Sequence, residues 1–120
     1  MEKIGEDENV IHYLVNDLSL ISSRLKDIII TGSDGNVRIS ITFLLSRINA
    51  DVVLVFHNVY EYSFYHNNKY DFYNVEYLKF FKKNERIYLS LDPADGSNIS
   101  DDDNDFILSE SIEGFILYHI

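Results

Sequence analysis

Apolar and polar residues alternate along several segments of the chain, which is the pattern of half-buried β-strands. The alternation is clearest over Val37–Phe43, where odd positions are apolar and even positions polar. The segment Thr31–Asn36 separates this run from three isoleucines, Ile28–Ile30, and contains Asp-Gly-Asn. Because those residues tolerate a positive φ, we predict a β-hairpin from Ile28 to Phe43.

A central strand is predicted over Asp51–His57, because this segment is apolar on both faces. Tyr60, Tyr62 and Phe64 then alternate with polar residues. They either continue the same strand or form a new one after a bend at Asn58.

The second half of the chain contains further strand patterns. Arg86–Leu91 alternates and ends before Pro93, which cannot continue a central strand. The apolar segments Phe106–Ile112 and Phe115–Ile120 flank Glu113-Gly114. We therefore predict two closing strands joined by a turn at that dipeptide.

Two segments have helical features. Asn74 is predicted to cap a short helix over Val75–Lys83, with Glu76 in its first turn and lysines toward its end, which complements the helix dipole. Val10–Ser22 fits either a helix or the entry to a strand. The fold class expected is mainly β, an antiparallel sandwich-like sheet of six to eight strands with one short helix. An α+β fold is the alternative if Val10–Ser22 is helical.

The length of 120 residues suits a single domain over residues 1–120, with residues 1–9 expected to be a flexible acidic N-terminus. The chain has no cysteine, which excludes a thiolate metal site and a cysteine nucleophile. The longest stretch without a charged residue, Val52–Tyr60, has nine residues, and no secretory signal is visible. We therefore expect a cytoplasmic protein that does not contact membranes.

Charge narrows the function further. Twenty acidic and ten basic residues give a net charge of −10, so the chain repels nucleic-acid backbones and is not expected to bind them. From Ile87 to Ile120 there are eight acidic residues and neither Lys nor Arg. This segment is either a solvated loop or a docking surface for a basic partner. The predicted docking residues are the eight acids together with a neighbouring tyrosine: Asp92, Asp95, Asp101, Asp102, Asp103, Asp105, Glu110, Glu113 and Tyr88.

Calcium binding is an alternative for part of the same segment. Asp101, Asp103 and Asp105 have the i, i+2, i+4 spacing of a calcium loop. The loop pattern then needs Gly at its sixth position and Glu at its twelfth, where this chain has Phe106 and Ile112. We therefore expect no metal ligands and no cofactor, and keep a calcium-binding module as the alternative function.

Catalytic residues are not expected. The histidines match no metal-binding spacing and are predicted to be structural or exposed. An enzyme using His12 or His66 with a carboxylate is a further alternative, although no motif orients either ring. A nucleic-acid mimic is disfavoured because its acidic residues would be spread along the chain. The four histidines are His12, His57, His66 and His119.

A block rich in tyrosine and phenylalanine, from Tyr60 to Phe81, is a second candidate surface. Core packing explains such a block most simply. A protein-binding face is the other interpretation, because tyrosine combines a large contact area with a polar tip.

Three segments carry a resemblance to a known group of proteins. They are Val15–Leu18 before the hairpin, the strand end Val55–Val59, and Tyr88–Pro93 followed by Ser100–Asp105 and a closing strand. Across Val10–Ile120 the chain resembles small bacterial immunity proteins encoded beside polymorphic toxins, including those of contact-dependent growth inhibition.

The resemblance implies a non-enzymatic function in the cytoplasm, in which a monomer binds and neutralises a cognate toxin domain in a tight one-to-one complex. The toxin is expected to be a basic nuclease, with an RNase preferred, and a toxin that is not a nuclease is the alternative. A nuclease presents a positive cleft, and an inhibitor of opposite potential gains association rate and specificity.

Overall fold

The structure, a computed structural model, describes residues 1–69 and 73–120. Seven strands form one antiparallel sheet, and a single short helical segment precedes the hairpin, so the prediction of a mainly β antiparallel fold is confirmed. The elements are β1 (Glu2–Glu6), α1 (Glu8–His12), the π-helical η1 (Tyr13–Asp17), β2 (Arg24–Ser33), β3 (Asn36–Leu45), the 3-10 turn η2 (Ser46–Ile48), β4 (Ala50–Ser63), β5 (Lys79–Lys83), β6 (Arg86–Asp92) and β7 (Asn104–Tyr118).

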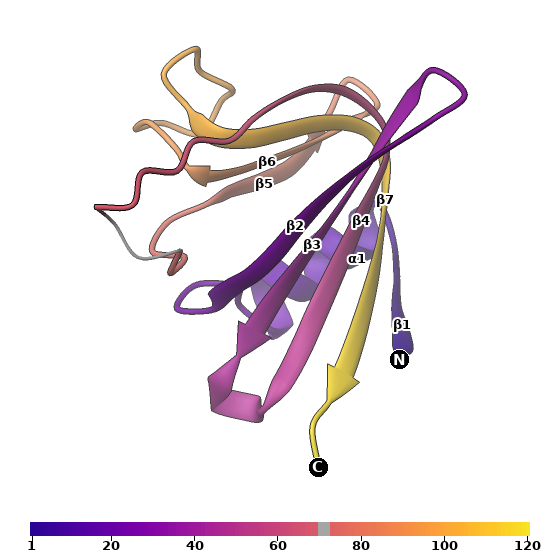
Figure 1. Ribbon diagram of the computed structural model, residues 1–120, viewed down its shortest axis with the longest axis vertical. Coiled ribbons are helices and arrows are strands. Elements are labelled where there is room, and N and C mark those ends of the chain that lie inside the picture. The colour runs from indigo at the N-terminus through magenta and orange to yellow at the C-terminus, as the bar shows by residue number, and fades with distance from the viewer. Residues whose placement is uncertain (70–72) are drawn as a thin grey trace.

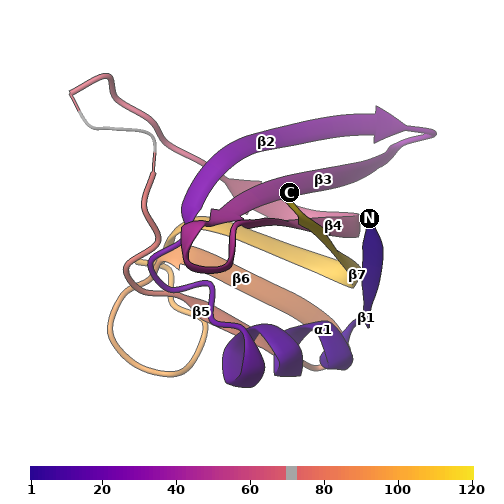
Figure 2. The same ribbon diagram turned by 90° about the horizontal axis from the view of Figure 1, so that it is seen from below.

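The sheet is built around its two longest strands. The strand order is β2-β3-β4-β7-β6-β5, and β1 also pairs with β7. β4 and β7 pair from Ala50–Tyr118 at one end to Ser63–Phe106 at the other. β3 pairs with the first half of β4, whereas β6 pairs with the first half of β7. The sheet therefore folds over, and β2 and β3 lie on the opposite side of the core from β5 and β6 (Figure 1, Figure 2).

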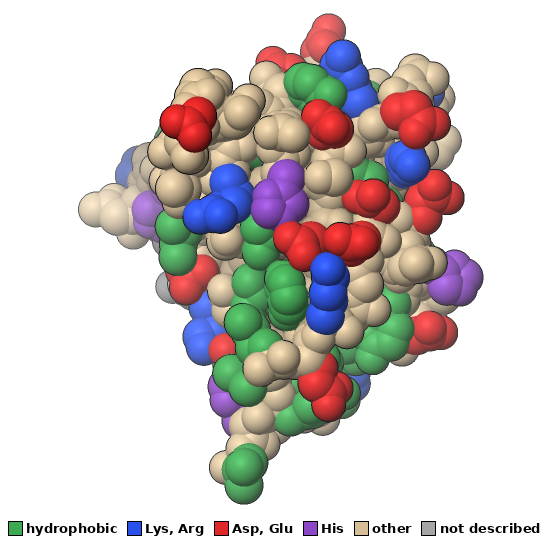
Figure 3. Space-filling view, turned by 90° about the vertical axis from the view of Figure 1, so that its right-hand side faces the viewer, with side chains coloured by type: hydrophobic (Ala, Val, Ile, Leu, Met, Phe, Trp, Pro, Cys, Tyr) green, Lys and Arg blue, Asp and Glu red, His purple; other side chains and the backbone are tan. Residues whose placement is uncertain are grey.

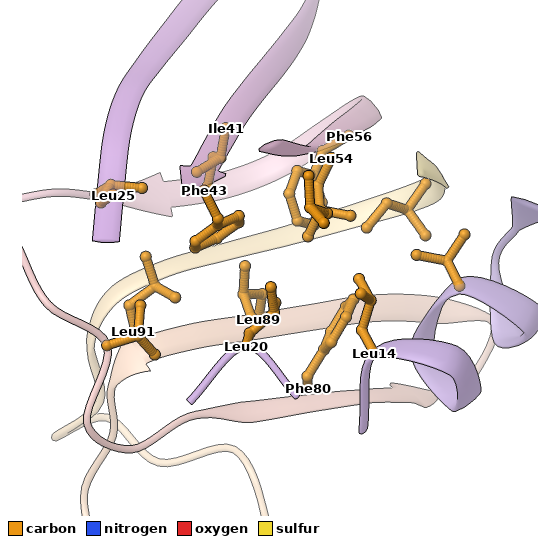
Figure 4. Close-up of a cluster of buried hydrophobic side chains, with 14 of the residues drawn as sticks. Leu14, Leu20, Leu25, Ile41, Phe43, Leu54, Phe56, Phe80, Leu89 and Leu91 are labelled. Carbon is orange, nitrogen blue, oxygen red and sulfur yellow. The ribbon is translucent and has the colours of Figure 1, made fainter. Parts of the chain in front are cut away.

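The core lies between these two parts of the sheet. Along β3, Ile39, Ile41 and Phe43 are fully buried and alternate with partly exposed residues, as the sequence pattern predicts. Leu54 and Phe56 of β4 point from the same side toward Leu89, Leu91 and Phe80 of β5 and β6 (Figure 4). Leu14 and Leu20, from the segment before β2, complete the cluster shown there.

The strand β4 settles one of the open alternatives. It continues through Asn58 to Ser63 as a single strand. Asn58 has a positive φ of 50°, and the pairing with β7 shifts register between Val59 and Glu61. The bend predicted at Asn58 is therefore a local irregularity within one strand.

The glycine at position 114 lies within β7 and does not form a turn. β7 runs from Asn104 to Tyr118 without interruption, so the prediction of two closing strands is wrong. A Cβ at Gly114 would lie 3.0 Å from Cγ1 of the buried Val10 in α1. The glycine is thus explained by the close approach of α1 to the sheet.

The helix predicted over Val75–Lys83 is also wrong. Val75 exchanges backbone hydrogen bonds with Ser22 and Ser23, and β5 pairs with β6. Phe80 of β5 packs in the core, while the next residue, Phe81, faces away from it toward Tyr88. This period of two belongs to a strand.

The N-terminal residues Glu2–Glu6 form a strand of the sheet, and the flexibility expected of residues 1–9 stays a prediction. β1 pairs with β7, and the backbone N–H of Asp7 donates to the carbonyl of Ile112 at 2.9 Å. The Asp7 carboxylate accepts in return from the N–H of Ile112 at 2.9 Å. Over residues 1–69 and 73–120, no helix is long and apolar enough to cross a membrane.

Candidate functional site

The connection between β6 and β7, residues 93–103, is here called the acidic loop. It folds back over the face of β5 and β6 that points away from the core. Lys79 of β5 donates from Nζ to the carbonyl of Asn98 at 2.7 Å, and the hydroxyl of Tyr88 of β6 donates to Asp103 at 2.6 Å. The loop therefore covers Tyr88, which is only 2% exposed.

Asp103 holds the acidic loop in this conformation. Its Oδ1 accepts from Nζ of Lys79 at 2.7 Å and from the N–H of Ala94 at 2.8 Å. Its Oδ2 accepts from the hydroxyl of Tyr88 at 2.6 Å and from the N–H of Ser100 at 3.0 Å. One carboxylate thus joins β5, β6 and both ends of the loop, with its side chain 0% exposed.

The ionisation of Asp103 follows from these contacts. Burial alone would raise the pKa of its carboxyl group. The hydrogen bonds from Lys79, Tyr88 and two backbone N–H groups outweigh burial and lower the pKa to about 2. The pKa of Tyr88 is raised by burial and by its bond to Asp103. At neutral pH the loop is therefore organised around an ionised carboxylate that a buried lysine neutralises.

Asp105 is a second structural carboxylate in the same run. It accepts from the N–H of Tyr65 at 2.9 Å and from the hydroxyl of Tyr73 at 2.9 Å. Burial, and then this bond, raise the pKa of Tyr73. Asp103 and Asp105 are thus occupied within the chain, which removes two of the three carboxylates of the calcium alternative. Within the described part of the chain, no group of three or more His, Asp or Glu side chains is placed to hold a metal ion.

The remaining predicted docking residues separate into two groups. Glu113 bonds Lys3 at 2.9 Å and His57 at 2.6 Å, and these partners lower the pKa of its carboxyl group. Glu110 is exposed but accepts from Asn58 at the bend of β4. It lies six positions beyond the start of β7, about 20 Å along the strand from the loop. The carboxylates that stay exposed in or next to the acidic loop are Asp92, Asp95, Asp101 and Asp102.

The prediction that all nine residues contact a partner therefore needs correction for three of them. Tyr88, Asp103 and Asp105 are buried, so a partner that docks on this structure cannot reach their side chains. Their contribution is to shape the loop. By contrast, no cation among residues 1–69 and 73–120 lies in ion-pair distance of the four exposed aspartates.

Tyr77 is an exposed aromatic residue that lies beside two of the exposed aspartates, Asp92 and Asp95. It is 73% exposed. On one side it lines a hollow of about 570 Å³ together with Ile21, Pro93 and Asp95. On the other side it lines a smaller hollow of about 200 Å³ together with Asp92. The sequence placed Tyr77 in the aromatic block but gave no sign that it lies beside the acidic loop. We call Tyr77 with Asp92, Asp95, Asp101 and Asp102 the acidic docking surface.

The histidines are not among the residues of the acidic docking surface. His57 bonds Glu113, and Nε2 of His119 lies 3.0 Å from Oδ1 of Asp51. His12 pairs with Asn16 at 3.0 Å, and His66 is exposed. Figure 3 shows the side of the molecule where β1 and β7 lie, with a strip of hydrophobic side chains and histidine, acidic and basic side chains beside it.

Comparisons of the chain with protein-family models, with curated proteins and with solved structures give no match.

Proposed function

We propose that this protein is a non-enzymatic immunity protein that binds a cognate toxin domain, one to one and in the cytoplasm, through the acidic docking surface. The toxin is a basic protein, with a nuclease that acts on RNA preferred. One observation carries the proposal: the buried Asp103 bonds both ends of the acidic loop, and four carboxylates in or next to that loop have no cation in ion-pair distance among the described residues.

The free protein carries an electrostatic cost at this surface. Like charges held close together repel one another and lower the stability of the folded chain. A loop without a binding role has no need to be fixed in such an arrangement. A basic partner removes the repulsion, and the loop that receives it is already ordered. The arrangement therefore favours binding over solubility as the role of these residues.

Tyr77 supplies the apolar part of the proposed contact. Binding energy at protein interfaces concentrates in a few residues, among which tryptophan, tyrosine and arginine are enriched. An exposed tyrosine between aspartates suits a partner that presents arginine or lysine, since the cation can stack on the ring while carboxylates neutralise it. A nuclease has such side chains in the cleft that binds phosphates.

The experiment is a calorimetric titration of the toxin domain encoded beside this gene, at about 0.15 M and about 0.5 M salt. The proposal predicts one-to-one binding at the lower salt and a clear loss of affinity at the higher salt. Tight binding that salt does not change would move the interface away from the acidic docking surface. No binding at either salt would overturn the immunity function.

A further inference from the structure

The strand β2 forms one end of the sheet, and among residues 1–69 and 73–120 few contact its outer edge. At its start, the N–H of Leu25 donates to the carbonyl of Tyr73 at 3.0 Å, and Arg24 bridges to Asn74. Beyond that point β2 pairs only with β3. No described residue outside β3 makes a backbone hydrogen bond to Asp27–Ser33. Because successive residues of a strand point their backbone groups to opposite sides, alternate residues of Asp27–Ser33 have N–H and C=O groups on the outer edge that no described residue pairs.

From Ile28 to Ser33 this edge lacks the charges, prolines and bulges that usually prevent strands from pairing between molecules. It contains no proline, and its only register shift lies before Asp27. Lys26, which could protect the edge, instead bonds the Asp51 carboxylate at 2.8 Å. Ile29 and Ile30 are 54% and 45% exposed on opposite faces of the strand. Such an edge is suited to receive another strand with apolar side chains on both faces.

We propose that the added strand is β2 of a second copy, paired antiparallel about a two-fold axis at Ile29. In this register the two Ile29 side chains meet on the outer face. Ile28 of each copy lies opposite Ile30 of the other on the inner face, where Ile28 already packs against the core. The pairing spans Asp27–Thr31 of each copy and stops short of Leu25, whose N–H is already used.

Charge supports the same register. Thr31 pairs with Arg38 of β3, and Asp27 would lie opposite Thr31 of the second copy. Asp27 of one copy and Arg38 of the other are then two strands apart, about 10 Å between Cα atoms, which the two side chains can bridge. Neither residue has an ion-pair partner in the described chain. Because the dimer has two-fold symmetry, the ion pair between Asp27 of one copy and Arg38 of the other occurs twice.

The hairpin is also the part of the molecule where two acidic copies can approach. Residues 24–45 contain three basic and two acidic side chains, whereas the whole chain has a net charge of −10. The acidic loop lies at the other end of the sheet order, over β5 and β6. The proposed pairing uses Asp27–Thr31 of β2 and none of the residues of the acidic docking surface, so each proposal is tested by its own variants.

Sedimentation equilibrium tests the dimer. A contact this small is expected to be weak, so the protein is measured from about 10 µM to about 500 µM. The mass should rise from 14.0 kDa toward twice that value, about 28 kDa. Ile29→Lys should abolish the rise without changing the thermal midpoint, because Ile29 is more than half exposed in the monomer. The control Ile99→Lys, 46% exposed in the acidic loop, should still dimerise.

Charge exchange tests the register. Asp27→Arg should raise the dissociation constant at least about fivefold, and adding Arg38→Asp should restore it. Hydrogen exchange gives a further readout, since the amides of the β2 edge should become protected as concentration rises. A protein that stays monomeric at the highest concentration would overturn the proposal. So would a dimer that Ile29→Lys leaves intact.

Discussion

Lys79 and Asp103 form a buried ion pair, with Nζ and Oδ1 2.7 Å apart, that fastens the acidic loop to β5. The two residues are 24 positions apart in the chain. A buried pair of this kind contributes little net stability relative to apolar residues, but removing one partner leaves an uncompensated charge. Its evident consequence here is conformational: the same carboxylate that bonds Lys79 also fixes the backbone at Ala94 and Ser100.

Removing this carboxylate should destabilise the protein strongly. Asp103→Asn leaves the Lys79 ammonium buried without a counter-charge, so we predict a loss of about 3–5 kcal/mol in the free energy of unfolding. Urea titration measures the loss. The control Asp101→Asn changes the same residue type two positions away, where the side chain is exposed, and should shift stability by less than about 0.5 kcal/mol. Equal effects of the two substitutions would contradict the role assigned to Asp103.

The lowered pKa of Asp103 should make the stability of the protein depend on pH in the acidic range. Its pKa falls from 3.8 to about 2 on folding. A lowered pKa stabilises the folded state above the unfolded value and loses that effect as pH falls through the folded value. The stability difference between the native protein and Asp103→Asn should therefore shrink by about 2 kcal/mol between pH 4 and pH 2. A difference that stays constant over this range would mean that Asp103 is not held ionised.

Tyr77 should matter for binding and not for folding. Tyr77→Ala removes a side chain that is 73% exposed, so the unfolding midpoint should stay unchanged. Its affinity for the toxin domain should fall at least about tenfold if Tyr77 anchors the interface. Tyr118→Ala, at the opposite end of β7 and 53% exposed, is the matched control and should bind normally. The assignment fails if both variants bind like the native protein.

Gly114 should be required for α1 to pack closely against β7. In Gly114→Ala the new methyl group lies 3.0 Å and 3.1 Å from the two Cγ atoms of Val10, which must move. We expect a loss of about 1–3 kcal/mol in the free energy of unfolding. Gly32→Ala, which meets nothing within 4 Å, should be close to neutral. Thermal unfolding of both variants would decide, and a neutral Gly114→Ala would contradict the tight contact.

The local pattern of apolar and polar residues is sufficient to predict a strand when the strand it pairs with follows it in the chain. The hairpin from Ile28 to Phe43 and the doubly apolar β4 were predicted because alternation and turn residues report directly on local structure. Gly114 was misread because a glycine in a strand and a glycine in a turn look alike. Only the packing of Val10, more than a hundred positions away, distinguishes them.

The candidate site, too, could be predicted from the sequence only in part. The acidic run at Asp101–Asp105 was visible in the sequence, but its division into exposed and buried carboxylates was not. Asp103 and Asp105 are buried because Lys79 and Tyr73 reach them from other parts of the chain. The Lys79 contact comes from β5, which is a strand, whereas the lysine spacing suggested a helix.

The most direct test of the acidic docking surface is the rate of association with the toxin domain encoded beside this gene. Two variants are compared by stopped flow, each with four acids neutralised so that the net charge falls from −10 to −6. One carries Asp92, Asp95, Asp101 and Asp102 changed to Asn. The other carries Glu2→Gln, Asp17→Asn, Asp34→Asn and Glu61→Gln, all exposed elsewhere.

We predict that the first variant associates at least about tenfold more slowly than the native protein and loses most of its salt dependence, because local charge at the contact steers the encounter. The second variant should retain most of the native rate. Equal slowing of the two variants would show that only net charge matters. An unchanged rate in the first variant would contradict the acidic docking surface itself.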